Sequence, residues 1–82
     1  MAYTRAHIRL NTVNDINAFV SEINRDGTAN KYTIENFDGK IRVSARSMMG
    51  VLYAMTDFND EMFIVNETVD GVFPHVVDSY RV

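Results

Sequence analysis

The stretch from Ser44 to Met55, SARSMMGVLYAM in one-letter code, contains the serine with the most informative neighbours in the chain. Ser47 stands where a strand pattern ends and a helical pattern begins. Serine is a preferred helix cap, and its replacement by alanine at such a position costs roughly 1 kcal/mol. A phosphate there would meet free backbone amides and the helix dipole, and it would add a charge of about −2. Ser47 therefore suits the role of a helix cap, and the position would also tolerate a phosphate.

Other reactive groups are few. Cysteine is absent, which excludes disulfides, thiolate nucleophiles and zinc-thiolate sites. The two histidines are His7, on a strand face, and His75, near the start of a short helical pattern. The spacing of Asp57, Asp60 and Glu61 lacks the alternating oxygen ligands of a calcium loop and indicates a solvated turn. Because no phosphate loop, nucleophile elbow or acid–base pair is present, we expect no metal, no cofactor and no enzyme activity.

Length and composition favour one globular domain over residues 1–82. Hydrophobic residues make up 46% and charged residues 23% of the 82-residue chain, which is ordinary for a folded domain. The longest run of apolar residues plus glycine, Met48 to Met55, is far shorter than the roughly 20 residues of a membrane span. No signal-peptide core stands at the start. A net charge of −3 argues against nucleic-acid binding. The absence of cysteine fits a reducing cytosol, so we expect a cytoplasmic protein.

Four strands are predicted from the alternation of apolar and polar residues. The first lies near residues 5–10. Residues 32–35 and 40–43 form a hairpin around a turn at 36–39 that ends in glycine. Residues 62–65 are the most continuously apolar segment, which is typical of an interior strand.

Three helices are predicted between and after these strands. Apolar residues recur at the helical spacing i, i+3, i+4, i+7 over residues 13–25. Thr12 and Asp15 resemble a capping box at its start, and Gly27 is expected to end this helix in a left-handed conformation. Ser47 caps the second helix.

The last helix is short. Phe73, Val76, Val77 and Tyr80 have helical spacing, and Pro74 is expected at the first helical position. The order βαββαβα and the one-sided apolar faces predict an α+β fold, with three helices on one face of a four-stranded antiparallel sheet.

The uncovered face of that sheet is expected to be basic. Strand alternation directs several cations toward it, and they are Arg5, His7, Arg9, Lys40 and Arg42. A solvated face with edge charges that discourage strand pairing explains this pattern. Binding of an anionic ligand or protein surface is the functional alternative.

One motif carries a resemblance to a known family. The residues Arg46-Ser47-Met48-Met49-Gly50-Val51-Leu52 resemble the segment that opens the second helix of the HPr phosphocarriers of the bacterial sugar phosphotransferase system. The turn Asp38-Gly39-Lys40 and the element order agree with the same family. The resemblance covers nearly the whole chain and implies the open-faced β-sandwich of that family.

The family's phosphate acceptor has no counterpart here. It is a histidine at the start of the first helix, followed by arginine and proline, and these positions fall near Thr12, Asn14 and Asp15. A carboxylate at Asp15 would repel a phosphoryl dianion. The resemblance is therefore to the catabolite-repression type of HPr, which also lacks this histidine. A displaced acceptor, His7 or His75, remains an alternative.

The resemblance also implies roles for the second helix. The serine matching Ser47 is phosphorylated by a dedicated kinase in some members, so Ser47 is a candidate phosphorylation site. The residues matching Met48, Met49 and Leu52 form an apolar docking patch, although core packing is the alternative for such residues. We expect protein partners of the phosphotransferase or catabolite-repression type, with no nucleic acid or membrane. The other hypothesis is a binding domain that uses the basic sheet face.

Overall fold

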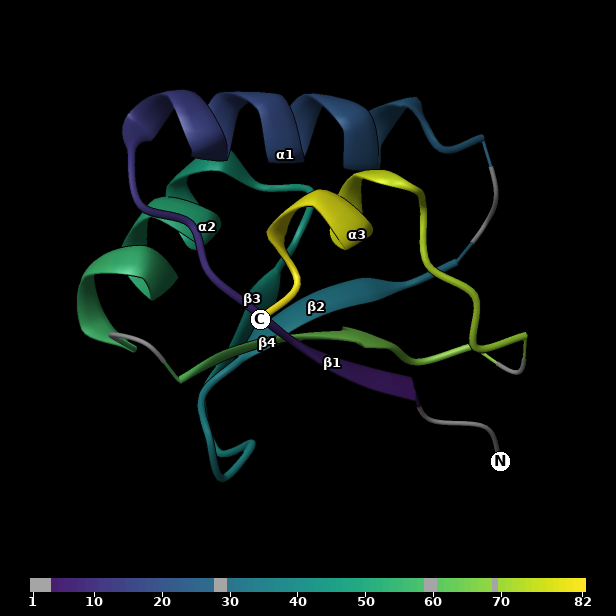
Figure 1. Ribbon diagram of the computed structural model, residues 1–82. Coiled ribbons are helices and arrows are strands. Elements are labelled where there is room, and N and C mark those ends of the chain that lie inside the picture. The colour runs from purple at the N-terminus through teal and green to yellow at the C-terminus, as the bar shows by residue number, and fades with distance from the viewer. Residues whose placement is uncertain (1–3, 28–29, 59–60, 69) are drawn as a thin grey trace.

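The computed structural model describes residues 4–27, 30–58, 61–68 and 70–82. Its elements are β1 (Thr4–Ile8), α1 (Val13–Arg25), β2 (Tyr32–Glu35), β3 (Arg42–Ser44), α2 (Met48–Asp57), β4 (Met62–Asn66) and α3 (Val76–Tyr80). The predicted order βαββαβα is confirmed. Figure 1 shows the three helices stacked on one face of the sheet, and the other face is open.

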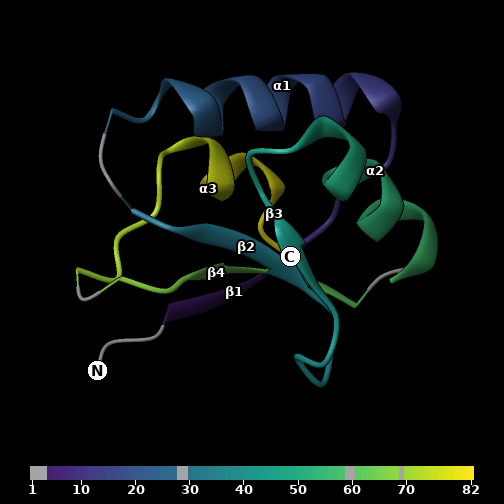
Figure 2. The same cartoon turned by 180° about the vertical axis from the view of Figure 1, so that it is seen from behind.

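The four strands form one antiparallel sheet in the order β1-β4-β2-β3. β4 is an interior strand, as its continuous apolar sequence predicts. Gly39 in the turn between β2 and β3 has a φ of 72°, which glycine adopts without strain. Figure 2 shows that this turn projects away from the helices.

The start of α1 forms the predicted capping box, whereas its end differs from the prediction. The Thr12 side chain accepts the Asp15 N–H, and the Asp15 side chain bonds back to the cap. At the other end Asp26 adopts an extended conformation and its N–H donates to the carbonyl of Ile23. The chain has then already left the helix, so Gly27 is not needed as a left-handed cap, and it does not adopt that conformation.

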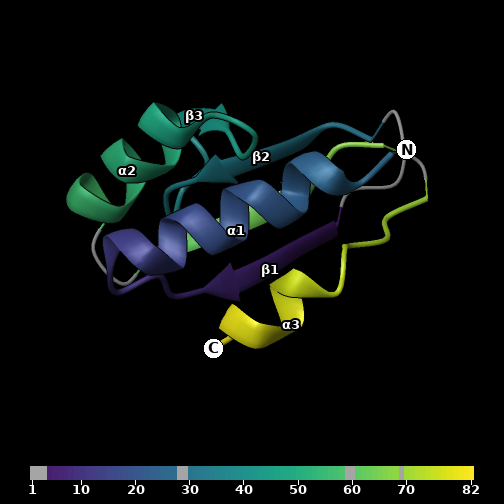
Figure 3. The ribbon, with the colours of Figure 1, turned by 90° about the horizontal axis from the view of Figure 1, so that it is seen from above.

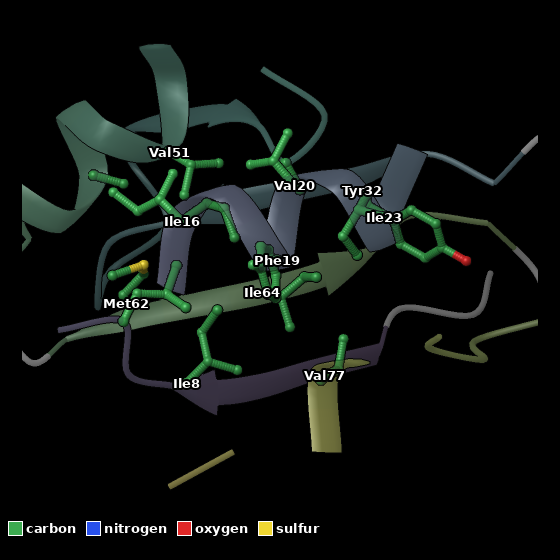
Figure 4. Close-up of a cluster of buried hydrophobic side chains, with 14 of the residues drawn as sticks. Ile8, Ile16, Phe19, Val20, Ile23, Tyr32, Val51, Met62, Ile64 and Val77 are labelled. Carbon is green, nitrogen blue, oxygen red and sulfur yellow. The ribbon is translucent and has the colours of Figure 1, made fainter. Parts of the chain in front are cut away.

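The core lies between α1 and the sheet. Seen from above, α1 runs along the middle of the sheet, nearly aligned with β1, with α2 on one side and α3 on the other (Figure 3). Its buried stripe is Ile16, Phe19, Val20 and Ile23. Figure 4 shows these side chains gathered with Ile8, Ile64, Val51 and Val77 from other elements. In the described part of the chain, no helix combines the length and apolar character that a membrane crossing requires.

The predicted short last helix is present, but Pro74 does not start it. His75 is the N-cap of α3 and Pro74 precedes it, and the Pro74 carbonyl accepts the N–H of Val77. After α3 the chain runs along the outer side of β1, where Arg81 pairs with Ile8 and the Val82 N–H donates to the His7 carbonyl. The C-terminal segment therefore covers part of a sheet edge.

Candidate functional site

Ser47 is placed by the junction between β3 and α2. Its backbone is extended, and its Oγ accepts the Gly50 N–H at 3.1 Å, so it caps the helix. Gly50 lies against β3, because a Cβ added there would be 3.2 Å from the Val43 Cβ and 3.3 Å from the Ser44 carbonyl oxygen. The cap and this close approach together fix where α2 begins.

The outer face of α2 is a continuous apolar surface. Met49 is 75% exposed, Met48 41% and Leu52 37%, and Tyr53 beside them is 42% exposed. Residues four apart share a helix face, so Met48 neighbours Leu52 and Met49 neighbours Tyr53. We call these four residues the α2 patch. Val51 and Ala54, on the opposite side of the helix, are fully buried.

Tyr53 is a member of the α2 patch that the sequence analysis missed. Its ring contacts Phe58 edge-on at 5.8 Å. Partial burial, the negative charge of Asp57 and a hydrogen bond to that carboxylate raise the pKa of Tyr53 above 10.0. Its position four residues after Met49 was a signal that could have identified it.

Arg46, the basic residue before Ser47, is engaged elsewhere. Its guanidinium donates to the carbonyls of Ile23 and Asn30, at 2.8 and 3.2 Å. It also lies 3.9 Å from the Asp26 carboxylate and over the Tyr32 ring. Arg46 thus joins the end of α1 to the start of β2, a role that sequence spacing did not indicate.

The amides at the start of α1 are occupied by the chain's own carboxylate. Asp15 Oδ2 accepts the N–H of Asn11 at 2.9 Å and that of Thr12 at 3.2 Å. Backbone donors at a helix N-terminus are the groups that would otherwise hold an anion. The start of α1, where the sequence resemblance would place an acceptor histidine, has a threonine cap and the negative charge of Asp15.

The two histidines lie in different settings. The His7 ring stacks on Phe63, with centroids 4.7 Å apart, on the open face of the sheet. His75 is exposed and makes no side-chain cap bond at the start of α3, which has five residues. Asp60, considered above with Asp57 and Glu61, lies outside the described residues.

The open face combines cations with carboxylates. Arg5, His7 and Arg42 lie on its strands, but Arg9 follows the end of β1 and Lys40 lies in the hairpin turn, which corrects their expected place within the sheet. Glu35, with a side chain only 2% exposed, forms ion pairs with two arginines: Arg5 at 2.7 Å and Arg42 at 3.2 Å.

A second carboxylate extends this network. Glu67 accepts the Thr33 hydroxyl at 3.0 Å and lies 3.4 Å from Arg42. A shallow depression beside these groups is lined by Lys31, Tyr32, Thr33, Arg42, Val43, Ser44 and Glu67. The positive charge of this face is therefore largely neutralised within the face itself. The alternation that predicts Arg42 on this face also predicts Glu35 there.

Comparison with known proteins agrees with the fold. The chain is similar to a crystal structure of the phosphocarrier protein HPr from Bacillus anthracis strain Ames, with a TM-score of 0.58 and 28% sequence identity. The match covers 85% of this chain and 82% of that chain. No family model matches the sequence, and no curated protein matches it. The fold is HPr-like.

Proposed function

We propose that this protein is an HPr-like regulatory or protein-interaction domain related to the bacterial sugar phosphotransferase system, and that it docks on protein partners through the α2 patch. The observation that carries this proposal is four exposed apolar side chains beside the Ser47 cap. Solvent-exposed apolar patches of this kind are typical of interaction sites. Methionine in such a patch adapts to partners of different shape.

The second part of the proposal is that the domain does not carry phosphate on histidine. Thr12 and Asp15 replace the groups that a phosphohistidine needs at the start of α1. The Asp15 carboxylate already accepts two of the local amides, and its charge would oppose a phosphoryl dianion. The domain would act as a binding protein in the cytoplasm, without a cofactor or nucleic acid.

Ser47 would then be the regulated position. A phosphate on its Oγ would add about −1.5 to −2 charges at a helix N-terminus, where the dipole favours anions. Since the α2 patch begins at the next residue, the added charge would lie at the edge of the docking surface. Phosphorylation would therefore change which partners dock.

Intact-mass measurement tests the phosphate chemistry. The protein is incubated with phosphoenolpyruvate and the first enzyme of the phosphotransferase system, and separately with the family's serine kinase and ATP. Bacillus anthracis HPr serves as the positive control. We expect no acid-labile phosphate from the first reaction and a stable phosphate at Ser47 from the second. A stoichiometric phosphohistidine would refute the proposal, and His7→Gln and His75→Gln variants would then identify the displaced acceptor.

The open sheet face supports a second candidate function, the binding of an anionic ligand or partner unrelated to sugar transport. The observation that favours it is the depression lined by Lys31 and Arg42. Lys31→Glu and Arg42→Glu variants discriminate between the two candidates, because both side chains line the depression. Loss of partner binding in these variants supports the sheet face. Unchanged binding there, with a loss in Met48→Gln and Leu52→Gln, supports the α2 patch.

A further inference from the structure

The four methionines that the structure describes differ widely in exposure. Met49 is 75% exposed and Met48 41%, whereas Met62 is 1% exposed beneath the helices and Met55 packs against the core. The chain has no cysteine, so methionine supplies all of its side-chain sulfur. Because oxidation of sulfur depends on access by the oxidant, a peroxide would reach the two methionines of the α2 patch before the partly buried Met55 and the buried Met62.

We propose that Met48 and Met49 form a reversible oxidation site, at which a peroxide converts the α2 patch from an apolar to a polar surface while the fold is retained. In this step the thioether sulfur attacks one oxygen of hydrogen peroxide. An S–O bond forms as the O–O bond breaks, sulfur loses two electrons, and the second oxygen leaves as water after proton transfer. A thiol-dependent sulfoxide reductase returns the thioether, and the sulfoxide oxygen leaves as water while two thiols are oxidised to a disulfide.

The fold would tolerate this modification because other residues hold α2. Val51 and Ala54 bury their side chains completely, and the Ser47 Oγ caps the helix through Gly50. Met48 and Met49 occupy the first two positions of α2, outside this buried set. A sulfoxide oxygen on either side chain would therefore point into solvent, where it remains hydrated.

Docking would not tolerate the modification equally well. Met48 shares a helix face with Leu52, and Met49 with Tyr53, so both sulfur atoms lie within the surface that a partner would cover. Burial of a sulfoxide dipole without a hydrogen-bond donor is unfavourable. We expect oxidation to weaken docking by about tenfold, the effect of one buried polar group left unpaired. This consequence rests on the proposed docking function, whereas the order of oxidation does not.

Peptide mass spectrometry after timed exposure of the full chain to hydrogen peroxide tests the site. Among the four methionines that the structure describes, we expect sulfoxide first at Met49, then at Met48, and only later at Met55 and Met62. The oxidised protein should keep its urea midpoint and elute earlier from a hydrophobic-interaction column. Oxidation of Met62 as fast as Met49, unfolding of the singly oxidised protein, or unchanged retention would each overturn the proposal.

The Met48→Leu/Met49→Leu double variant is the matched control, since leucine keeps the surface apolar and does not react. Its retention and its rate of kinase-dependent Ser47 phosphorylation should be insensitive to peroxide, while those of the parent protein fall. An equal fall in the double variant would overturn the assignment to these sulfur atoms. If Leu52→Gln leaves the phosphorylation rate unchanged, the docking function fails, and the peptide masses still decide whether the oxidation site exists.

Discussion

Ser47 stabilises the fold whether or not it is modified. Its Oγ satisfies the Gly50 N–H, one of the amides that a helix start leaves without an intrahelical partner. We predict that Ser47→Ala lowers the free energy of unfolding by about 1 kcal/mol, measured by urea denaturation. Ser47→Thr keeps the acceptor and should lose much less, and Ser79→Ala on the exposed side of α3 should be neutral. Equal stability of Ser47→Ala and Ser79→Ala would contradict the capping role.

Two glycines make a second prediction at the residue scale. Gly50→Ala would place a Cβ 3.2 Å from the Val43 Cβ and 3.3 Å from the Ser44 carbonyl oxygen, which must move apart. Although alanine favours a helix, we expect a net loss of about 1 kcal/mol from overpacking. Gly27→Ala meets nothing within 4 Å and has no left-handed φ, so it should gain about 0.5 kcal/mol. Thermal unfolding of both variants decides this, and a stabilising Gly50→Ala would show that α2 can move away from β3.

At the scale of elements, polar side chains join segments that the apolar pattern leaves separate. Arg46 connects the end of α1 to the start of β2, and Asn30 connects that same start to the segment after β4 by donating to Asp70 at 2.9 Å. Asp70 also accepts from Asn66 and from the Val72 N–H. These bonds hold the connection between α1 and β2 against the segment after β4.

Asp70 makes this group of hydrogen bonds sensitive to acid. The hydrogen bond from Asn30, followed by that from the Val72 amide, holds the pKa of Asp70 below its ordinary value of 3.8. Since the folded-state pKa is the lower one, Asp70 stabilises the fold at any pH above its unfolded pKa. That stability is lost as the pH falls through the folded pKa.

We therefore predict that the urea midpoint falls more between about pH 6 and about pH 3 in the parent protein than in Asp70→Asn, which cannot titrate. Asp78→Asn, on the exposed surface of α3, is the control and should keep the parent's pH dependence. Identical pH profiles of the urea midpoint for the parent and Asp70→Asn would show that the hydrogen bonds of Asp70 do not contribute to the acid sensitivity of the fold.

For the whole molecule, short-range patterns predicted the elements and their order, because strand and helix periods are local properties of the chain. These local patterns did not predict the side-chain contacts that depend on how distant elements pack together. Arg5 and Glu35 are 30 residues apart on strands that are separated by β4, so their ion pair depends on the sheet order. The bonds of Arg46 depend in the same way on how α1 packs beside α2. Met48, Met49 and Leu52 of the α2 patch were predicted from the family resemblance, and the helical spacing of Tyr53 from Met49 could have added the fourth residue.

The contacts of α3 predict that it unfolds together with α1 and the sheet. Tyr80 on α3 contacts Phe19 of α1 edge-on at 5.9 Å, and its carbonyl accepts the Arg9 N–H beside β1. Tyr80 therefore connects the helical layer to an outer strand, and β1 pairs in turn with β4 from the other half of the chain. Because Tyr80 is half-buried, we predict that Tyr80→Ala lowers the free energy of unfolding by about 2 kcal/mol. The parent protein, whose Tyr80 reports on α3, should unfold in one transition, with circular dichroism and tyrosine fluorescence giving the same midpoint. An early fluorescence change in the parent that is absent from Tyr80→Ala, with an unchanged circular-dichroism midpoint, would mean that α3 unfolds alone and that its contact with Phe19 adds little to the stability of the sheet.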